Sequence, residues 1–168
     1  MIPARRTLLS LLSLGSLSAC GFSLRGSQLS SRLPFSSIYL QVTPHSLLER
    51  ELRGAVLGQD GVVLAKDPKS AEVVLQIFSE ALEKKVMTLN AQGQVRELSL
   101  LYRLKFEARG RDGKILIPAS ELALQALMSF SESQAPAKEA EEKMNFSELR
   151  NDAINQLMRR LAQVKLDE

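Results

Sequence analysis

The chain has 168 residues, a length that suits one domain with a substantial hydrophobic core. Its 22 Lys and Arg residues nearly balance 19 Asp and Glu residues, and two of the bases, Arg5 and Arg6, precede an N-terminal apolar run. A nucleic-acid-binding domain needs a dense basic face, so this balance argues against nucleic acid as a partner.

Residues 1–19 have the layout of a secretory signal peptide. Two arginines are followed by an apolar run from Thr7 to Leu17 and by the small pair Ser18-Ala19. The run is shorter than the ~20 apolar residues that a membrane-spanning helix requires. The sequence therefore predicts that residues 1–19 are removed on export.

Cys20, the only cysteine in the chain, directly follows this pair. A single cysteine cannot form an intramolecular disulfide in the oxidising compartment to which exported proteins travel. The pattern Leu17-Ser18-Ala19-Cys20 resembles the bacterial lipoprotein signal, in which the cysteine receives lipid and becomes the new N-terminus. That resemblance implies a membrane anchor of several acyl chains, palmitate among them. The alternative is an ordinary signal peptide whose cysteine lies at the cleavage point by chance.

The segment after the cysteine is expected to be a tether. Gly21, rather than Asp, follows Cys20, which in lipoproteins of this kind implies the outer membrane rather than retention at the inner membrane. Residues 20–37 are rich in serine and lack periodicity, as linkers do. Alternation from Ile38 to Val42 then predicts a strand with one buried face.

A helix is expected after this strand. Thr43 can cap it with Pro44 at the first position, or Ser46 can cap it one turn later in a capping box. Gly58 or Gly61 would end it. Its buried face is expected to contain Leu48, Leu52, Ala55 and Val56.

Two longer strands are predicted next, after the short run Val62-Val63-Leu64 and a turn. The first extends from Val73 towards Met87, and the polar stretch 89–94 follows it as a turn. The clearest alternation in the sequence then predicts a long antiparallel strand with one wet face. Its apolar side contains Leu98, Leu100, Tyr102, Leu104, Phe106 and Ala108. Its polar side contains Glu97, Ser99, Arg103, Lys105, Glu107 and Arg109.

Asp112-Gly113 predicts a hairpin with a type I′ turn, which needs positive φ at both central residues. The returning strand is expected from Lys114 to about Phe130. Pro118 marks an edge strand or a bulge, because proline cannot donate to a ladder. The apolar face of this strand is expected to contain Leu122, Leu124, Ala126, Met128 and Phe130.

From Pro136 the apolar period changes to 3.6, which predicts a long final helix. Arg150 is assigned to its polar faces. The buried stripe is expected to contain Leu149, Ala153, Leu157 and Leu161, widened by Ile154, Met158 and Val164. The expected order is β-α-β-β-β-α: an α+β two-layer sandwich in residues 38–168, with two helices on one face of a mostly antiparallel four-stranded sheet.

The residue inventory argues against an enzyme. His45 is the only histidine and stands at a helix start, where a polar cap residue is expected, and Cys20 is the predicted lipid attachment site. The sequence has no phosphate-binding glycine loop, nucleophile elbow or metal-binding histidine pair. Glu139, Glu141 and Glu142 open a helix as a solvated face rather than as an acid-base pair. We expect no catalytic residue, no metal and no cofactor apart from the covalent lipid.

Four features together resemble one family. They are the start Cys20-Gly21-Phe22-Ser23-Leu24-Arg25-Gly26, the strand-helix opening, the hairpin pattern from Glu97 to Phe106 with its Gly-containing turn, and the closing stretch Asn151-Asp152-Ala153-Ile154-Asn155-Gln156-Leu157-Met158-Arg159-Arg160-Leu161. Over residues 20 to about 165 the chain is similar to LptE, the lipopolysaccharide-assembly outer-membrane lipoprotein of Gram-negative bacteria. The resemblance implies a two-layer α/β domain that plugs the lumen of the outer-membrane β-barrel LptD, helps assemble it and binds lipopolysaccharide.

A lipopolysaccharide binder should gather Lys or Arg near one end of the domain, because its ligand is an anionic amphiphile. A long hairpin can bring the 89–94 turn near residues 131–138. In the family the ligand site lies around this end, and Lys138 aligns with a basic position there. The candidate lipopolysaccharide-binding residues are Lys138, Arg96, Lys85, Lys84 and Lys143. Solubilising surface charge is the alternative role for each.

The sequence thus favours a non-enzymatic outer-membrane lipoprotein, facing the periplasm and the barrel lumen. It would plug and help assemble LptD and contact lipopolysaccharide during delivery to the outer leaflet. The polar row from Arg103 to Arg109 suits a polar lumen wall, and equally an ordinary solvated sheet face. One alternative is a generic periplasm-facing lipoprotein that binds a peptide or soluble protein by strand addition at a sheet edge. Another is an anchored enzyme, which a pocket with clustered carboxylates would support.

Overall fold

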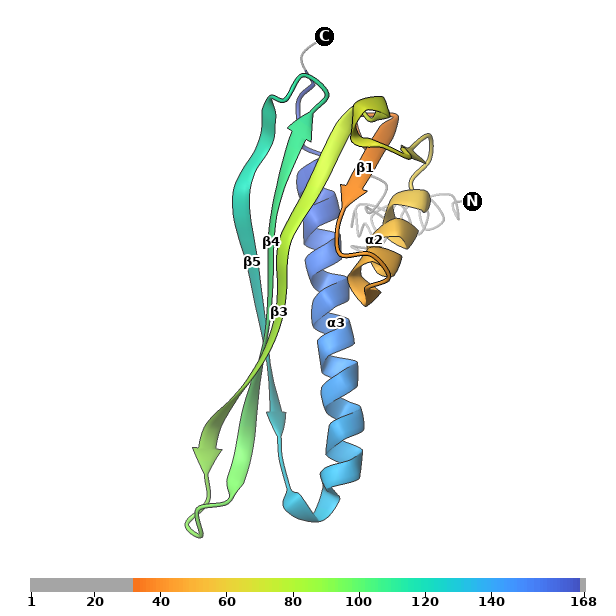
Figure 1. Cartoon of the computed structure of the whole chain (residues 1–168). Helices are drawn as coiled ribbons and strands as arrows, with labels where there is room; N and C mark the ends of the chain where they lie inside the picture. Colours follow the sequence, from red (N-terminus) through yellow and green to blue (C-terminus); the bar gives the residue numbers. More distant parts are fainter. Residues whose placement is uncertain (1–31, 167–168) are drawn as a thin grey trace, which may run out of the picture. The chain divides into compact units, whose positions relative to one another are not determined.

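A computed structural model describes residues 32–166, which form a sheet with helices on one face (Figure 1). Cys20, the predicted signal peptide and most of the predicted tether lie outside these residues. The strands are β1 (Ser37–Gln41), β2 (Val63–Leu64), β3 (Val73–Leu89), β4 (Val95–Gly110) and β5 (Ile115–Ser129). The helices are α2 (Leu47–Leu57), α3 (Ala135–Leu161) and the short 3₁₀ turns η2 (Pro68–Ser70) and η3 (Glu132–Gln134).

The sheet has five strands in the order β2-β1-β3-β4-β5, and it is mixed. β1 runs parallel to β2 and to β3, whereas β3, β4 and β5 form an antiparallel meander. The prediction of four mostly antiparallel strands was therefore wrong in detail, because β2 adds a fifth strand. β2 has only two residues, held by hydrogen bonds such as Val63 N to Ser36 O at 2.9 Å. A strand that short shows no periodicity in sequence.

β1 covers only the beginning of β3. Its register runs from Ile38 opposite Val73 to Gln41 opposite Gln76. Within residues 32–166, the later part of β3 pairs with β4 alone and its other side has no strand beside it. β3 and β4 continue together to the turn at Asn90–Gln94, far beyond the end of β1 (Figure 1).

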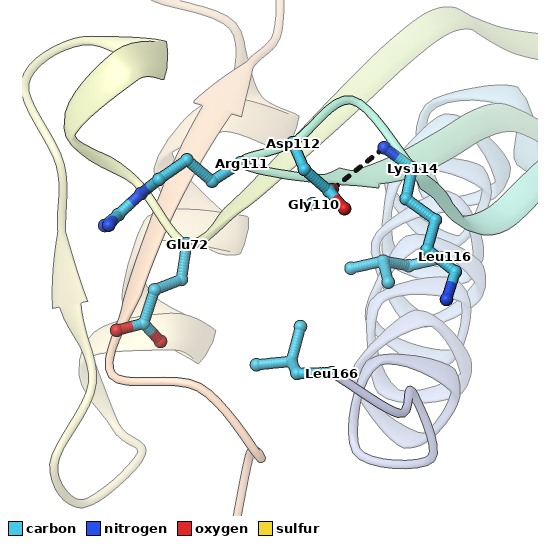
Figure 2. Close-up of a pocket in the computed structure, with 7 residues that line it drawn as sticks. All are labelled: Glu72, Gly110, Arg111, Asp112, Lys114, Leu116 and Leu166. Carbon is cyan, nitrogen blue, oxygen red and sulfur yellow. Dashed lines mark hydrogen bonds between the residues drawn. The ribbon is translucent and has the colours of Figure 1, made fainter. Parts of the chain in front are cut away.

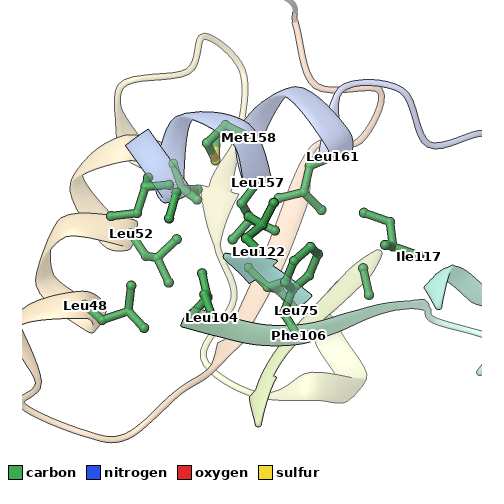
Figure 3. Packing of buried hydrophobic residues seen from close by; sticks show 14 of the residues in the cluster. Leu48, Leu52, Leu75, Leu104, Phe106, Ile117, Leu122, Leu157, Met158 and Leu161 are labelled. Atoms are coloured by element: carbon green, nitrogen blue, oxygen red, sulfur yellow. The ribbon is translucent and has the colours of Figure 1, made fainter. Parts of the chain in front are cut away.

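The core lies between the helices and the even-numbered side chains of β4. Figure 3 shows residues of α2, α3 and three strands converging there. The predicted apolar faces of β4, β5 and both helices are confirmed: the buried cluster contains Leu48, Leu52, Val56, Leu98, Leu100, Tyr102, Leu104, Phe106, Leu122, Leu149, Ala153, Leu157 and Leu161. Burying one such Leu or Phe side chain contributes ~1.5–3 kcal/mol. Leu33 and Phe35, before β1, also belong to this core.

The start of α2 resolves the two capping alternatives in favour of Ser46. The Ser46 hydroxyl accepts a hydrogen bond from Glu49 N at 3.0 Å, and the Glu49 carboxylate accepts one from His45 N at 2.6 Å. The helix ends at Gly58, whose N–H donates to Gly54 O at 3.0 Å, rather than at Gly61. His45 is exposed and has a φ of 61°, so it acts in the turn before the cap.

The β4–β5 turn departs from the predicted type I′ geometry. Gly113 has a φ of 83°, but Asp112 does not have positive φ. Gly110 N donates to Lys114 O at 2.8 Å, which leaves a three-residue loop with glycine in the left-handed position. The β3–β4 turn repeats this arrangement, with Gly93 at a φ of 78° and Asn90 N bonded to Gln94 O at 2.8 Å.

Pro118 lies both on an edge strand and at a bulge, the two positions expected for it. β5 is the last strand of the sheet, and its register with β4 shifts between Phe106 and Ala108. Glu107, opposite this shift, is only 6% exposed and binds Arg109 through its carboxylate, so its assignment to a wet face was wrong. Among residues 32–166, no helix is long and apolar enough to cross a bilayer.

Candidate functional site

The tip of the β3–β4 hairpin lies beside the connection from β5 to α3, as expected (Figure 1). Phe130 N donates to Arg96 O at 2.8 Å, and the Gln94 side-chain amide donates to Glu132 Oε2 at 3.4 Å. A cleft of about 470 Å³ opens between the two segments, lined by Asn90, Gln94, Val95, Arg96, Ser129, Phe130, Ser131, Glu132 and Ser133. The tip therefore combines a hollow with polar and apolar walls.

Arg96 lines this cleft, and Lys138 contacts Ser129, another of its lining residues. Arg96 also lines a neighbouring cleft of about 350 Å³; Ser129 belongs to both linings. Lys138 is in the first turn of α3, and its ammonium donates to Ser129 Oγ at 3.0 Å and to Glu141 Oε2 at 2.8 Å. Its side chain is 13% exposed. Arg96 has no carboxylate partner among the described residues, so its guanidinium is available to an anion.

The other three predicted bases lie around the tip without joining one patch. Lys84 faces α3 and pairs with Glu142 at 2.8 Å. Lys85 points to the opposite side of β3, since successive strand residues alternate, and is 3.7 Å from Glu83. Lys143 is exposed on α3. Of the five predicted bases, only Arg96 lines a cleft at the tip, and only Lys138 contacts another residue of that lining, Ser129.

The tip carries both signs of charge. Glu132 lines the larger cleft, Glu97 lines the smaller one, and Glu141 binds Lys138. An anionic ligand at Lys138 has to compete with the Glu141 carboxylate. Charge-assisted hydrogen bonds of this kind are stronger when they are desolvated, and this pair is partly buried, with Lys138 13% and Glu141 44% exposed.

A second charged cluster lies under the helices, and sequence reasoning missed it. Arg150 was assigned to a polar face, but it is only 7% exposed. Its Nε donates to Glu80 Oε1 at 2.8 Å, and Nη1 lies 3.6 Å from Glu51 Oε1. The Tyr102 hydroxyl donates to the same Glu80 oxygen at 2.9 Å, and its ring centroid is 5.9 Å from the guanidinium. This cluster joins α2, β3, β4 and α3.

Burial and charge act together on the titratable groups of this cluster. Burial first, and then the charge of Glu80, raises the pKa of the Tyr102 hydroxyl. Burial alone would lower the pKa of Arg150, but the hydrogen bond and charge of Glu80 outweigh it, so that pKa is raised. Arg150 therefore stays charged, and we interpret the cluster as a structural ion pair between layers. The position of Arg150 four residues before Ile154 is the signal that could have placed Arg150 on the buried stripe.

The opposite end of the domain has a cleft of about 430 Å³, shown in Figure 2. Its lining is Glu72, Gly110, Arg111, Asp112, Lys114, Leu116 and Leu166. Glu72 accepts hydrogen bonds from Ser36 Oγ at 2.6 Å and from Ser36 N at 2.8 Å. The bond from the Ser36 hydroxyl, and to a smaller extent the bond from the Ser36 N–H, hold the pKa of the Glu72 carboxyl below its usual value. They also fix the segment before β1 to this end of the domain.

Solved structures share this fold. The solution structure of an uncharacterized lipoprotein B from Nitrosomonas europaea has a TM-score of 0.71 and 27% identity, covering 84% of this chain and 90% of that one. Rare lipoprotein B from Shewanella oneidensis has a TM-score of 0.67 and 19% identity, covering 75% and 93%. A minor lipoprotein from Acinetobacter baumannii has a TM-score of 0.63 and 17% identity, covering 81% and 98%.

These three proteins, each named as a lipoprotein, place the domain in a shared α+β fold. The family model described as "LptE: Lipopolysaccharide-assembly" matches residues 35–161, from before β1 to the end of α3. The chain belongs to the LptE family, whose role is lipopolysaccharide assembly. A comparison with curated protein sequences finds no match.

Proposed function

We propose that this lipoprotein, anchored to the outer membrane through lipid on Cys20, plugs the LptD barrel, helps assemble it and contacts lipopolysaccharide with its hairpin tip. The observation that carries the proposal is the LptE family match over residues 35–161, which includes every strand and both long helices. No catalytic residue has a role in this function.

The sheet face away from the helices supports the plug. Arg103 lies 3.7 Å from Glu83 and 3.8 Å from Glu121, and Lys105 lies 3.5 Å from Glu121. These pairs connect three adjacent strands, β3, β4 and β5, across one polar surface. A barrel lumen is itself polar, so such a surface can exchange water for hydrogen bonds with the lumen wall.

The tip supports the lipopolysaccharide contact. Arg96, with no carboxylate partner in the described part of the chain, offers a planar fork of donors that suits phosphate. Lys138, released from Glu141, adds a second cation beside Ser129. The apolar wall of Phe130 in the same cleft suits an amphiphilic ligand. Lys84, Lys85 and Lys143 would contribute only long-range attraction from around the tip.

The test is affinity capture of the tagged full chain from detergent-solubilised outer membranes, with the captured proteins identified by mass. We expect a near-stoichiometric large β-barrel, LptD. Capture of the lipoprotein alone would contradict the plug. The leading alternative would then be a periplasm-facing lipoprotein that binds a peptide or soluble protein by edge addition, which the uncovered side of β3 favours.

A further inference from the structure

One side of β3 is a long free edge in the described part of the chain. From Ser79 to Leu89 the strand pairs with β4 on one side and, among residues 32–166, with no strand on the other. Leu82 and Val86 on this edge are 45% and 54% exposed. Free edges with apolar side chains are templates for pairing with another strand, and folded proteins normally shorten or cover them.

The sequence of this edge complements itself. If a second copy pairs antiparallel about a twofold axis at Lys84, Glu83 lies opposite Lys85 of the second copy, and Leu82 lies opposite Val86 of the second copy. The axis generates each pair twice. In antiparallel strands directly opposite side chains share a face, so the charged pairs lie on the helix-free face and the apolar pairs on the helix side.

The regular part of the edge fits the same axis. The pairing of β3 with β4 is regular from Ser79 to Val86, and its register shifts between Ile77 and Ser79, between Val86 and Thr88 and between Thr88 and Leu89. The regular stretch centred on Lys84 is therefore Leu82–Val86, which contains both complementary pairs. β1, which ends its pairing at Gln76, is not displaced.

Lys84 is the one residue that would meet its own copy. Like charges directly opposite each other are unfavourable. Lys84, however, points towards α3, where its ammonium is 2.8 Å from the Glu142 carboxylate. Each Lys84 thus keeps a partner within its own chain, which reduces the repulsion at the axis.

We propose that the free protein forms a twofold dimer through antiparallel pairing of β3 centred on Leu82–Val86, which joins two five-stranded sheets into one. The dimer requires neither lipid on Cys20 nor the barrel. The dimer and the plug function are therefore tested independently, and either result leaves the other proposal unaffected.

The first test is a disulfide at the axis. In Lys84→Cys the two residue-84 Cα atoms of the dimer lie about 5 Å apart, within the range of about 4–7 Å that a disulfide needs. We expect the purified full chain to cross-link on mild oxidation, with the joined peptides identified by mass. Val86→Cys is the matched control, because its two copies lie about 13 Å apart along the strands. Equal cross-linking of the two variants, or none with Lys84→Cys, would overturn the register.

The second test is a charge exchange. Glu83→Lys and Lys85→Glu each place like charges opposite each other twice, so each should weaken the dimer by about 10-fold or more. A 1:1 mixture of the two variants restores opposite charges and should dimerise again, which an unfolded variant could not do. Sedimentation equilibrium measures both, with Glu121→Lys on β5 as a control that leaves the dimer unchanged. A monomer at every concentration, or no recovery on mixing, would overturn the proposal.

Discussion

Arg150 places a positive charge where its helix neighbours Ala153, Ile154 and Leu157 are apolar and buried. The charge is tolerated because Glu80 and Glu51 approach it from β3 and α2. Such a pair adds little net stability compared with an apolar isostere, but removing one partner leaves the other charge buried and unpaired. The cluster therefore fixes the alignment of helices over strands more than it raises stability.

Arg150→Ala should lower the free energy of unfolding by about 3 kcal/mol, because it leaves the Glu80 carboxylate without its cationic partner and removes a partner of Glu51. Urea denaturation followed by circular dichroism measures the change. Arg159→Ala is the control, because Arg159 is exposed on the same helix and its loss should change stability by less than about 0.5 kcal/mol. Equal urea midpoints for the two variants would show that the cluster does not contribute to the free energy of unfolding.

The double variant Arg96→Glu with Lys138→Glu should weaken lipopolysaccharide binding by about 10-fold or more, because it removes the cation that lines the cleft and the cation bound to Ser129 beside it. Binding of purified lipopolysaccharide to the full chain measures the effect, and an unchanged circular dichroism spectrum shows that the domain stays folded. Lys66→Glu with Lys69→Glu makes the same change in net charge outside the tip, next to and within η2. If both double variants lose affinity equally, the cleft is not the binding site.

At the scale of elements, strands and helices with long patterns were predictable, and contacts between elements were not. β4 has an alternating apolar pattern, and α3 repeats Leu149, Ala153, Leu157 and Leu161, so the apolar face of each element follows from the sequence. The polar face of β4 was predicted less well, because Ser99 and Glu107 are buried. β2 is too short to alternate. The turn at Asp112-Gly113 was given the wrong geometry because the pair is compatible with loops of two or three residues.

In the candidate site, too, the contacts between elements could not be predicted from the sequence. Topology alone predicted that the hairpin tip would lie beside the β5–α3 connection. The pairing of Lys138 with Glu141, and of Lys84 with Glu142, depends on how α3 lies against the sheet. Arg150 was assigned to the wrong face of α3, because a charged residue type indicates an exposed position while its spacing from Ile154 indicates a buried one.

The segment before β1 is joined to β3 through Glu72. Because its folded pKa is lowered, the unfolded state binds more protons as pH falls, so the stabilisation is present above a pH of about 4.5 and is lost below it. Glu72→Gln should therefore lower stability at pH 7, and the difference from the parent protein should shrink at pH 3. Urea unfolding at both pH values measures it. An equal difference at both would mean that charge has no part in the junction.

At the scale of the whole molecule, Cys20→Ala should release the protein from membranes that lack LptD, because the variant lacks the proposed attachment site for acyl chains. Fractionation of cells without the barrel, followed by immunoblotting, measures the soluble share. Ser23→Ala, three residues further on, keeps the cysteine and should stay with the membrane pellet. Retention of Cys20→Ala in the pellet would mean that another contact anchors the chain.

The bond between Glu72 and Ser36 also fixes how far the hairpin tip lies from the point where the chain enters the domain. The chain enters the domain at the end that holds Glu72, and the hairpin tip is at the other end of the meander (Figure 1). β4 alone spans 16 residues, or about 50 Å at ~3.3 Å per residue. A hydrocarbon core is about 30 Å thick. In the proposed arrangement, a domain held by lipid in the inner leaflet and standing upright in the barrel can present Arg96 at the height of the opposite leaflet.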